Sequence, residues 1–439
     1  MAMKRVSRQS AGATAAVVTA SMAAAPDRVR GKLSDRDRAV TALAPIPPLE
    51  IRAKPGQLLG MPPAHFLRDY WQKRPLLIRN AFPGFVSPLS PEDLAGLACE
   101  EAALSRIVQH DRTKDRWSLR SGPFAESEFP KLPDHDWTLL VQDVDKWDAD
   151  VRALLERFDF LPRWRVDDVM ISFAATGGSV GAHVDQYDVF LLQGQGQRHW
   201  QIDTNPHAST AFRDDVELKL LREFHPTHEW TLEPGDMLYL PPGVPHHGVA
   251  VDACLTYSIG MRAPSQAELL VDFAEHLAEQ ASDEVRYADP DLKLPSDRYE
   301  IDAAALTRVR RALSAMQADD ATLAAWFGAY ISTYRSADVS APPKPPSADK
   351  VRKTLAEGGA LLRHPFMRSA WTRQGKRALW FVGGAAYPMR LASARELAAA
   401  TTIDAAQLDA LDADAQAAVI ALATGGSYAL QRPRRSKPR

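Results

Sequence analysis

The fold of this chain is decided by two stretches of sequence. Residues 181–202 read GAHVDQYDVFLLQGQGQRHWQI, and residues 232–248 read LEPGDMLYLPPGVPHHG. Both lie in a part of the chain, residues 168–262, where short apolar runs alternate with turns rich in glycine and proline. Short strands separated by such turns predict a β-sandwich or barrel. We expect strands at residues 169–174, 189–192, 198–202, 237–240 and 255–261, with the second and third forming a hairpin across residues 194–196.

The first stretch carries a pair of candidate metal ligands. His183 and Asp185 are two residues apart, so on an extended chain both side chains project to the same side. The second stretch ends in Pro245-His246-His247, where a turn and prolines aim a histidine from a distant strand. Two imidazoles and one carboxylate leave coordination positions open, a set that suits non-haem Fe(II). Only one of His246 and His247 can point to the metal, and the residues alone leave that choice open.

The rest of the chain divides into segments of different composition. Residues 1–46 are rich in Ala and Arg and predict a disordered extension, although the composition overlaps with that of a transit peptide. Helices are expected before the barrel, and again at residues 267–280, 303–318 and 321–334. A proline-rich linker is expected at 341–346, a compact unit at 347–430 and a basic tail at 431–439.

Composition excludes several classes of protein. A formal net charge of −2 gives no general electrostatic case for binding nucleic acid. Two cysteines, Cys99 and Cys254, cannot make a disulfide framework or a thiolate zinc site, and they fit a reducing compartment such as the cytoplasm. No apolar run reaches the roughly 18 residues that a membrane span requires.

The motifs resemble those of JmjC-type ribosomal oxygenases, and in particular the bacterial ribosomal-protein arginyl hydroxylases. The resemblance is carried by DYWQKRPLLIRNAF (69–82), by the two stretches quoted above and by YSIGMRAP (257–264). It implies an α+β fold with three parts: a double-stranded β-helix (JmjC/cupin) catalytic barrel over 47–264, a helical dimerisation domain over 265–340, and a winged-helix-like domain over 347–430. In that family the histidine directly after proline is the third ligand, which corresponds to His246.

The resemblance also implies a cosubstrate pocket. The residue that holds the distal carboxylate of 2-oxoglutarate corresponds to Arg198. The strand pattern supports this role, because Arg198 shares a face with Trp200 and Ile202, and a guanidinium on an apolar face is costly unless it meets an anion. Thr256 and Ser258 on the last strand are candidates for cosubstrate contacts or for simple packing, and Tyr187 and Gln186 are candidates for contacts with the substrate.

The implied activity is hydroxylation of a protein side chain. The resemblance points to 3-hydroxylation of an arginine in the sixteenth large-subunit ribosomal protein, by a homodimer that uses Fe(II), 2-oxoglutarate and O2 and releases succinate. Spacing alone does not choose arginine over histidine or asparagine, and a non-catalytic metal-binding cupin module is an alternative. The acidic helices of residues 391–424 argue against sequence-specific DNA binding.

Overall fold

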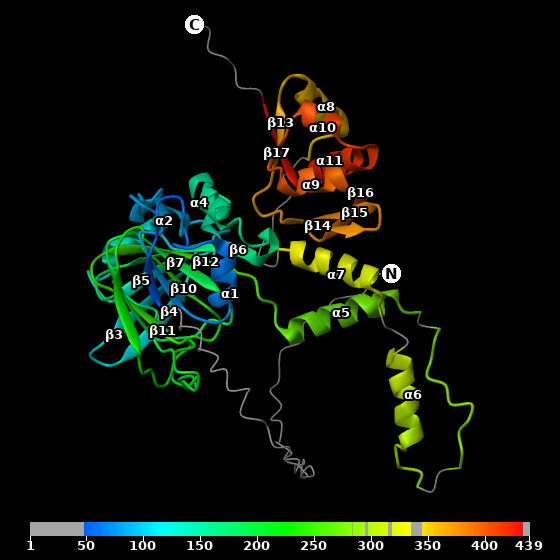
Figure 1. Cartoon of the computed structure of the whole chain (residues 1–439), viewed down its shortest axis with the longest axis horizontal. Helices are drawn as coiled ribbons and strands as arrows, with labels where there is room; N and C mark the ends of the chain where they lie inside the picture. The colour runs from blue at the N-terminus through cyan, green and yellow to red at the C-terminus, as the bar shows by residue number, and fades with distance from the viewer. Residues whose placement is uncertain (1–47, 283, 295–296, 315–317, 335–344, 433–439) are drawn as a thin grey trace, which may run out of the picture. The chain divides into compact units, whose positions relative to one another are not determined.

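The structure, a computed structural model, describes residues 48–282, 284–294, 297–314, 318–334 and 345–432. Within these residues the middle of the chain holds a nine-stranded sheet, in the order β1-β2-β10-β7-β12-β6-β5-β3-β4, and a three-stranded sheet, β11-β8-β9. Apolar side chains from both sheets, such as Leu191 and Trp200, share one buried cluster. The two sheets therefore enclose a common core, as expected for a JmjC/cupin barrel (Figure 1).

The strands of the barrel are short, as the sequence predicted. The large sheet consists of β1 (Glu50–Arg52), β2 (Leu76–Arg79), β3 (Ser105–Asp111), β4 (Arg116–Ser121), β5 (Trp137–Val141), β6 (Val166–Ala174), β7 (Val189–Gln195), β10 (Met237–Leu240) and β12 (Cys254–Met261). The small sheet consists of β8 (Arg198–Ile202), β9 (His228–Leu232) and β11 (His246–Ala250). The five strands expected in this region are all present, with ends shifted by three residues or fewer.

The predicted hairpin between β7 and β8 is wrong. β7 pairs with β10 and β12 in the large sheet, whereas β8 pairs with β9 and β11 in the small sheet. The turn around Gly196, which has a positive φ of 62°, therefore carries the chain from one sheet to the other. A glycine-rich turn between two apolar runs looks the same in sequence whether the runs pair or face each other. This crossing places Arg198 opposite the strands of the large sheet.

Both faces of β7 are buried, which explains its continuous apolar sequence. Val189 and Leu191 face the small sheet, and Phe190 and Leu192 face the helices and strands before the barrel. Those helices are α1 (Pro63–Asp69), α2 (Pro91–Leu97), α3 (Val144–Trp147) and α4 (Ala149–Leu154), with 3-10 turns η1 (Glu126–Lys131), η2 (Leu155–Phe158) and η3 (Arg163–Arg165). Ser90 caps α2, its side chain accepting a hydrogen bond from the amide of Asp93 at 3.1 Å.

Helices follow the barrel, as expected. They are α5 (Gln266–Gln280), α6 (Ala303–Ser314) and α7 (Asp320–Ser332). Residues 315–317, at the end of the second predicted helix (303–318), lie outside the described residues. So do residues 335–344, which include most of the expected linker, residues 1–47 and residues 433–439. In the part of the chain that the structure describes, none of the helices combines the length and the apolar character needed to cross a membrane.

The last part of the chain has its own core, formed around Trp380, Val419 and Tyr428. Its elements are α8 (Ala348–Ala356), β13 (Ala360–Arg363), β14 (Ser369–Gln374), β15 (Arg377–Val382), β16 (Ala385–Arg390), α9 (Leu391–Ala399), β17 (Thr402–Ile403), α10 (Ala405–Ala410), α11 (Ala413–Thr424) and β18 (Tyr428–Gln431). β14, β15 and β16 form one sheet and β17, β13 and β18 another. The small α+β unit agrees with the winged-helix-like part of the expected fold.

Candidate active site

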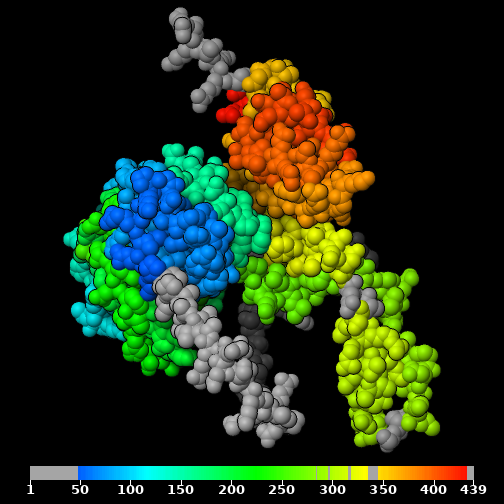
Figure 2. Space-filling view, in the orientation of Figure 1, coloured from blue at the N-terminus to red at the C-terminus, as the bar shows by residue number. Residues whose placement is uncertain are grey.

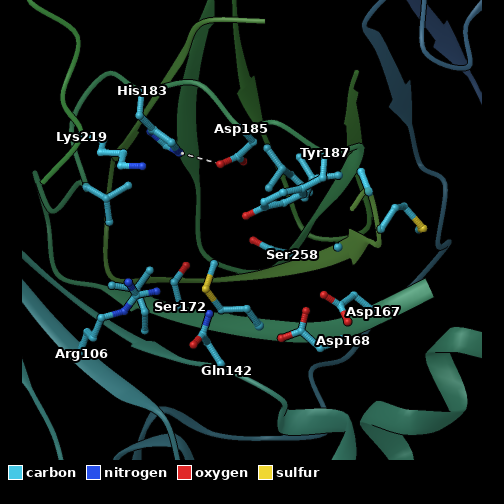
Figure 3. Close-up of a pocket in the computed structure, with 18 of the residues that line it drawn as sticks. Arg106, Gln142, Asp167, Asp168, Ser172, His183, Asp185, Tyr187, Lys219 and Ser258 are labelled. Atoms are coloured by element: carbon cyan, nitrogen blue, oxygen red, sulfur yellow. Dashed lines mark ion pairs between the residues drawn. The ribbon is translucent and has the colours of Figure 1, made fainter. Parts of the chain in front are cut away.

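Three predicted ligands converge at the open end of the barrel. His183, Asp185 and His246 each offer one ligand atom, and these atoms all lie within 4.8 Å of one another. Nε2 of His183 is 4.0 Å from Asp185 Oδ1, and Nε2 of His246 is 3.7 Å from Asp185 Oδ2. These separations let three side chains share one ion without moving the backbone. Figure 3 shows His183 and Asp185 on the same side of the pocket.

Backbone hydrogen bonds fix the two ligand segments against each other. The amide of His183 donates to the carbonyl oxygen of His246 at 3.0 Å, and the amide of His246 donates back at 2.9 Å. The amide of Gly243 donates to the carbonyl oxygen of Asp185 at 2.8 Å, within a turn where Gly243 has a φ of +79°. The tight proline-rich turn of the second motif therefore sets the position of all three side chains.

The two imidazoles are oriented with Nε2 toward the carboxylate. Nδ1 of His183 is 3.0 Å from the carbonyl oxygen of Gly181, and Nδ1 of His246 is 2.9 Å from that of Val244. A carbonyl accepts a hydrogen bond from Nδ1–H, which leaves Nε2 with its lone pair free for a metal. Burial, reinforced by His183, lowers the pKa of His246 well below its ordinary value, so this ring is neutral. Burial also raises the pKa of Asp185.

His247, the competing candidate, points elsewhere. It is not part of the cluster of possible ligands found among the described residues. Its ring packs edge-on against Phe224, with ring centroids 6.1 Å apart. Burial, with a smaller effect of Arg198, lowers the pKa of His247 to about 4. Adjacent residues of a strand face opposite sides, so His246 faces the cluster and His247 faces away.

Arg198 lies inside the barrel as the strand pattern predicted. The side chain is 3% exposed, and its Cζ is 5.1 Å from the ring centroid of Trp200. Nη2 donates to the carbonyl oxygen of Gly248 at 3.1 Å, but Nε and Nη1 are buried without a hydrogen-bond partner. Burial lowers the pKa of Arg198. A buried guanidinium with two unused donors is costly, and a bound anion would remove that cost.

Thr256 and Ser258 both line the same cavity, on the face of β12 that the sequence predicted. Thr256 Oγ1 donates to Gln193 Oε1 at 3.2 Å, and Ser258 is buried. β12 pairs with β6 so that Thr256 lies opposite Ser172, another hydroxyl of the cavity wall. A strip of hydroxyl groups therefore runs along the floor of the barrel.

The cavity has a volume of about 760 Å³, large enough for a cosubstrate and a side chain together. His183, Asp185, His246, Arg198, Thr256, Ser258 and Tyr187 all line it. Gln186 is exposed and is not among the lining residues, so its contact with a substrate stays a prediction. Tyr187, by contrast, is oriented into the pocket beside Asp185 (Figure 3).

The structure adds Asp168, which the sequence analysis did not single out as a site residue. Asp168 lines the cavity with Asp167 on the side away from His183 and Asp185 (Figure 3). Burial, together with the neighbouring carboxyls of Asp143, Asp167 and Asp145, raises its pKa to about 7. A signal was available in the pair Asp167-Asp168 at the start of an otherwise apolar strand, but their environment depends on distant segments.

A second acidic residue of the HVDQYD motif has a structural role. Asp188 is completely buried and accepts hydrogen bonds from Tyr239 Oη at 2.7 Å, from Gln72 Nε2 at 3.0 Å and from Arg165 Nη2 at 3.1 Å. These bonds fix the start of β7 and, with it, the segment that carries Asp185. The DYWQKRP motif therefore supports the site through Gln72.

Fold and site together define a JmjC-domain oxygenase. Residues 153–269 match the JmjC domain family, and residues 315–429 match the ROXA-like winged helix family. Over 306 residues the chain is 37% identical to the ribosomal protein uL16 3-hydroxylase of Escherichia coli K12, covering 68% of this chain and 79% of that protein. A probable ribosomal oxygenase of Haemophilus influenzae is 40% identical over 233 residues, which cover 53% of this chain and 55% of that protein.

Solved structures agree with these sequence matches. A crystal structure of E. coli ycfD superposes with a TM-score of 0.75 at 33% identity, covering 85% of this chain and 99% of that one. The complex of the same ribosomal oxygenase with cobalt and 2-oxoglutarate has a TM-score of 0.72 at 32% identity, with coverages of 85% and 99%. The chain therefore belongs to the JmjC-type ribosomal oxygenase family.

Proposed function

We propose that this protein is an Fe(II)- and 2-oxoglutarate-dependent protein hydroxylase in which His183, Asp185 and His246 hold the metal. Two imidazoles and one carboxylate match the donor set that non-haem Fe(II) uses, with positions left open for a cosubstrate and for O2. Once bound, the metal would supply the oxidising chemistry with O2 and 2-oxoglutarate, in which one oxygen atom enters the substrate and 2-oxoglutarate is converted to succinate and CO2.

The observation that carries this proposal is Arg198. Its two unpaired donors lie buried in the same cavity as the ligand cluster, where a dicarboxylate could reach both. A non-catalytic cupin module would have no use for such a costly cation. We assign Arg198 to the distal carboxylate of 2-oxoglutarate and Thr256 and Ser258 to the cavity wall beside it. The solved complex of the E. coli relative with cobalt and 2-oxoglutarate supports this assignment.

The cavity also favours a cationic substrate side chain. The fold buries the carboxyl of Asp168 beside other carboxyls in this pocket. That burial is unfavourable for the charged form, and a bound cation would offset the cost. A guanidinium pairs with a carboxylate through two parallel hydrogen bonds, so arginine fits better than asparagine or a neutral histidine. We assign Tyr187, which lies between Asp185 and this acidic side in the pocket, to packing against the aliphatic part of that side chain.

The chain's own residues would bind, orient and protect the reacting groups. Arg198 holds one end of the cosubstrate, and Asp168 holds the far end of the substrate side chain. With both ends fixed, one carbon of the substrate is presented to the metal site, and positioning of this kind is a large part of catalysis. The relative named uL16 3-hydroxylase supports C3 of an arginine in that ribosomal protein as the target. Hydroxylation of another protein side chain is the second candidate.

We further propose that the protein acts as a homodimer in the cytoplasm, where ribosomal proteins are found. α5 and α6 have apolar residues on their surfaces, with no buried side chain in either helix. Leu306, Val309 and Leu313 form one stripe of α6 and are 53%, 44% and 67% exposed. An apolar stripe of this kind needs a partner. In Figure 2 the yellow-green surface of this region is open on the face shown. Residues 265–340 would then be the dimerisation domain.

The function is tested by anaerobic loading with Fe(II) and 2-oxoglutarate, followed by O2 and uL16 of the same organism. We expect stoichiometric succinate and a mass increase of one oxygen on a single arginine, located by tandem mass spectrometry. The same peptide with glutamine at that position is the control. Release of succinate with another hydroxylated residue would favour the second candidate, and absence of any turnover would refute the oxygenase proposal.

A further inference from the structure

Four carboxyls gather at the acidic side of the cavity. Asp143 and Asp145 lie at the start of α3, and Asp167 and Asp168 lie at the start of β6. The burial of Asp143 and Asp145 is nearly complete. Such a cluster is unfavourable because each negative charge raises the free energy of the others. The ways in which the fold compensates these charges therefore determine which carboxyl remains ionised.

Asp143 connects Asp168 to a residue far along the chain. Its backbone amide donates to Asp168 Oδ2 at 3.1 Å. Its carboxylate accepts a hydrogen bond from the hydroxyl of Tyr334, directly after α7. Burial raises the pKa of Asp143, and the hydrogen bond from Tyr334 opposes that effect. Tyr334 therefore stabilises the charge of Asp143 and holds the loop that binds Asp168.

Asp167 is compensated from the C-terminal part of the chain. Nη2 of Arg368, one residue before β14, donates to the carbonyl oxygen of Asp167 at 3.2 Å and forms an ion pair with its carboxylate. Cζ of Arg368 lies 4.7 Å from the ring centroid of Tyr334, so the two side chains pack as one unit. Lys146, whose Nζ lies 5.9 Å from the centroid of the same ring, pairs with Asp145.

Asp168 is the carboxyl left over for a ligand. Among the described residues, Asp143, Asp145 and Asp167 each have a side chain that donates to their carboxylate or forms an ion pair with it, whereas Asp168 accepts the backbone amide of Asp143 and no ion pair is found for it. Arg368, Tyr334 and Thr333 also line the cavity, so the C-terminal part reaches the substrate side of the pocket. Apart from the candidate metal ligands and Arg198, the other charged groups that line this cavity are Arg106, Arg262, Glu217, Glu268 and Lys219.

We propose that Tyr334 and Arg368 are positioning residues for substrate recognition: they compensate Asp143 and Asp167, so that the carboxylate of Asp168 is available near neutral pH and takes the cationic side chain of the substrate. This inference rests on the proposed function and deepens it. It gives Tyr334 and Arg368, which lie outside the barrel strands, a part in the affinity for substrate. Neither residue contacts the metal ligands or Arg198.

Electrostatics determines the direction of the effect. Without Arg368, Asp167 becomes an uncompensated charge next to Asp168 and raises the pKa of that carboxyl above its present value near 7. More of the protein then holds a neutral Asp168 at pH 7, and a guanidinium binds it poorly. Raising the pH restores the carboxylate, so the defect should shrink above pH 8. The groups whose charges interact with Asp168 are Asp143, Asp145, Asp167, Tyr187 and Tyr334. Lys146 and Arg368 act on this balance through Asp145 and Asp167, with which they pair.

The test compares Arg368→Gln, Arg368→Lys and Tyr334→Phe with Arg377→Gln in the full-length protein. Arg377 is a matched control, because it pairs with Asp414 on the surface of the same part of the chain. We expect KM for a uL16 arginine peptide to rise about fivefold at pH 7 in Arg368→Gln, because a rise of about one unit from a pKa near 7 lowers the ionised fraction of Asp168 from about half to about one tenth. KM for 2-oxoglutarate should stay unchanged, and Arg368→Lys should restore most of the peptide affinity.

A double variant separates charge from structure. Asp167→Asn removes the charge that Arg368 compensates, so Arg368→Gln/Asp167→Asn should recover the peptide KM of the wild type. An unchanged peptide KM in Arg368→Gln overturns the inference. The inference is also overturned if Arg368→Gln loses affinity for 2-oxoglutarate as well as for the peptide and the double variant does not restore it. That result would mean that Arg368 has a general structural role.

A direct titration keeps this inference distinct from the proposed function. The carboxyl carbon of Asp168, assigned in 13C NMR with Asp168→Asn, reports its pKa without any substrate. The pKa should rise in Arg368→Gln and return in the double variant, whatever the substrate is. If the wild type binds no arginine peptide, the proposed substrate is wrong; if the titration does not move, the role of Arg368 is wrong.

Discussion

Nη2 of Arg198 donates to the carbonyl oxygen of Gly248 at 3.1 Å. Arg198 lies in β8 and Gly248 in the neighbouring β11, two residues beyond His246. The strand that presents the third candidate ligand therefore also orients the guanidinium. A metal and a dicarboxylate would be bound by adjacent strands whose register is fixed by backbone pairing.

Replacing Arg198 should remove the affinity for 2-oxoglutarate while making the empty protein more stable. Arg198→Met removes a buried charge with unused donors, so we expect a higher melting temperature without ligand. It also removes charge-assisted hydrogen bonds of about 1.5–3 kcal/mol, so the Kd of 2-oxoglutarate should rise by roughly 10- to 100-fold. Calorimetry on the cobalt-loaded protein measures the melting temperature without 2-oxoglutarate and the Kd of 2-oxoglutarate. Arg222→Met, at a residue that forms a surface ion pair, is the control. A Kd within twofold of wild type contradicts the assignment.

Gly248→Ala should weaken 2-oxoglutarate binding without touching a ligand. A Cβ at this position would lie 2.7 Å from Arg198 Nε and 2.7 Å from the ring of Trp200. Displacing that packing costs about 1–3 kcal/mol, and the guanidinium must move. The matched control is Gly96→Ala in α2, where a Cβ meets nothing within 4 Å. That change should stabilise the protein by about 0.5–1 kcal/mol and leave the Kd unchanged. Equal effects in both variants would rule out the packing argument.

Local sequence was enough to predict the ligand cluster. His183 and Asp185 are two residues apart on one strand-like segment, and Pro245 and the preceding turn aim His246, so short-range geometry fixes each piece. The inward face of Arg198 was also predictable, because alternation along a strand is a local property. The separate small sheet could not be predicted, because the turn near Gly196 has the same sequence features in a hairpin and in a crossing between two sheets.

The acidic side of the cavity could not be predicted from the sequence. The environment of Asp168 depends on Asp143, 25 residues earlier, and on Tyr334 and Arg368, far later in the chain. Charge compensation across such distances leaves no periodic pattern in the sequence. It follows from packing, and only the folded chain reveals which carboxyl lacks a cation.

Replacing the two adjacent histidines should separate their roles. His246→Ala removes a candidate ligand, and we expect cobalt affinity to fall by more than about 100-fold, since even partners of ligands are worth about 10- to 100-fold. His247→Ala loses only the contact with Phe224 and should cost about 1 kcal/mol of stability while metal binding stays. The visible absorption of bound cobalt reports binding without turnover. Loss of the cobalt spectrum in His247→Ala alone would reverse the assignment.

Charges on the apolar stripe of α6 should dissociate the proposed dimer. Leu306 and Leu313 are seven residues apart and face the same side of the helix. The double variant Leu306→Glu/Leu313→Glu should sediment as a monomer with an unchanged circular dichroism spectrum. Val86→Glu, at an apolar residue that is 83% exposed in the barrel part, is the control and should leave the oligomeric state unchanged. A wild-type protein that sediments as a monomer contradicts the dimer itself.

The pH dependence of substrate binding should follow Asp168. Since its pKa is raised to about 7, the carboxylate is present above that pH and is lost below it. The Kd of an arginine peptide should therefore rise about tenfold per pH unit below pH 7 and level off above it. Asp168→Asn should bind the peptide weakly and without this pH dependence. Calorimetry at constant metal and 2-oxoglutarate saturation separates the effect from cosubstrate binding.

The same pKa predicts the sign of a stability effect. Because the folded state holds the proton of Asp168 more tightly than the unfolded chain does, its contribution to stability falls as the pH rises from about 4 to about 7. Asp168→Asn removes that penalty, so the variant should melt above the wild type at pH 8 and approach it at pH 4. Asp134→Asn, at an exposed aspartate, is the control. A variant that melts below the wild type at pH 8 would mean that Asp168 stabilises the fold, and the case for a carboxylate kept for a substrate cation would fail.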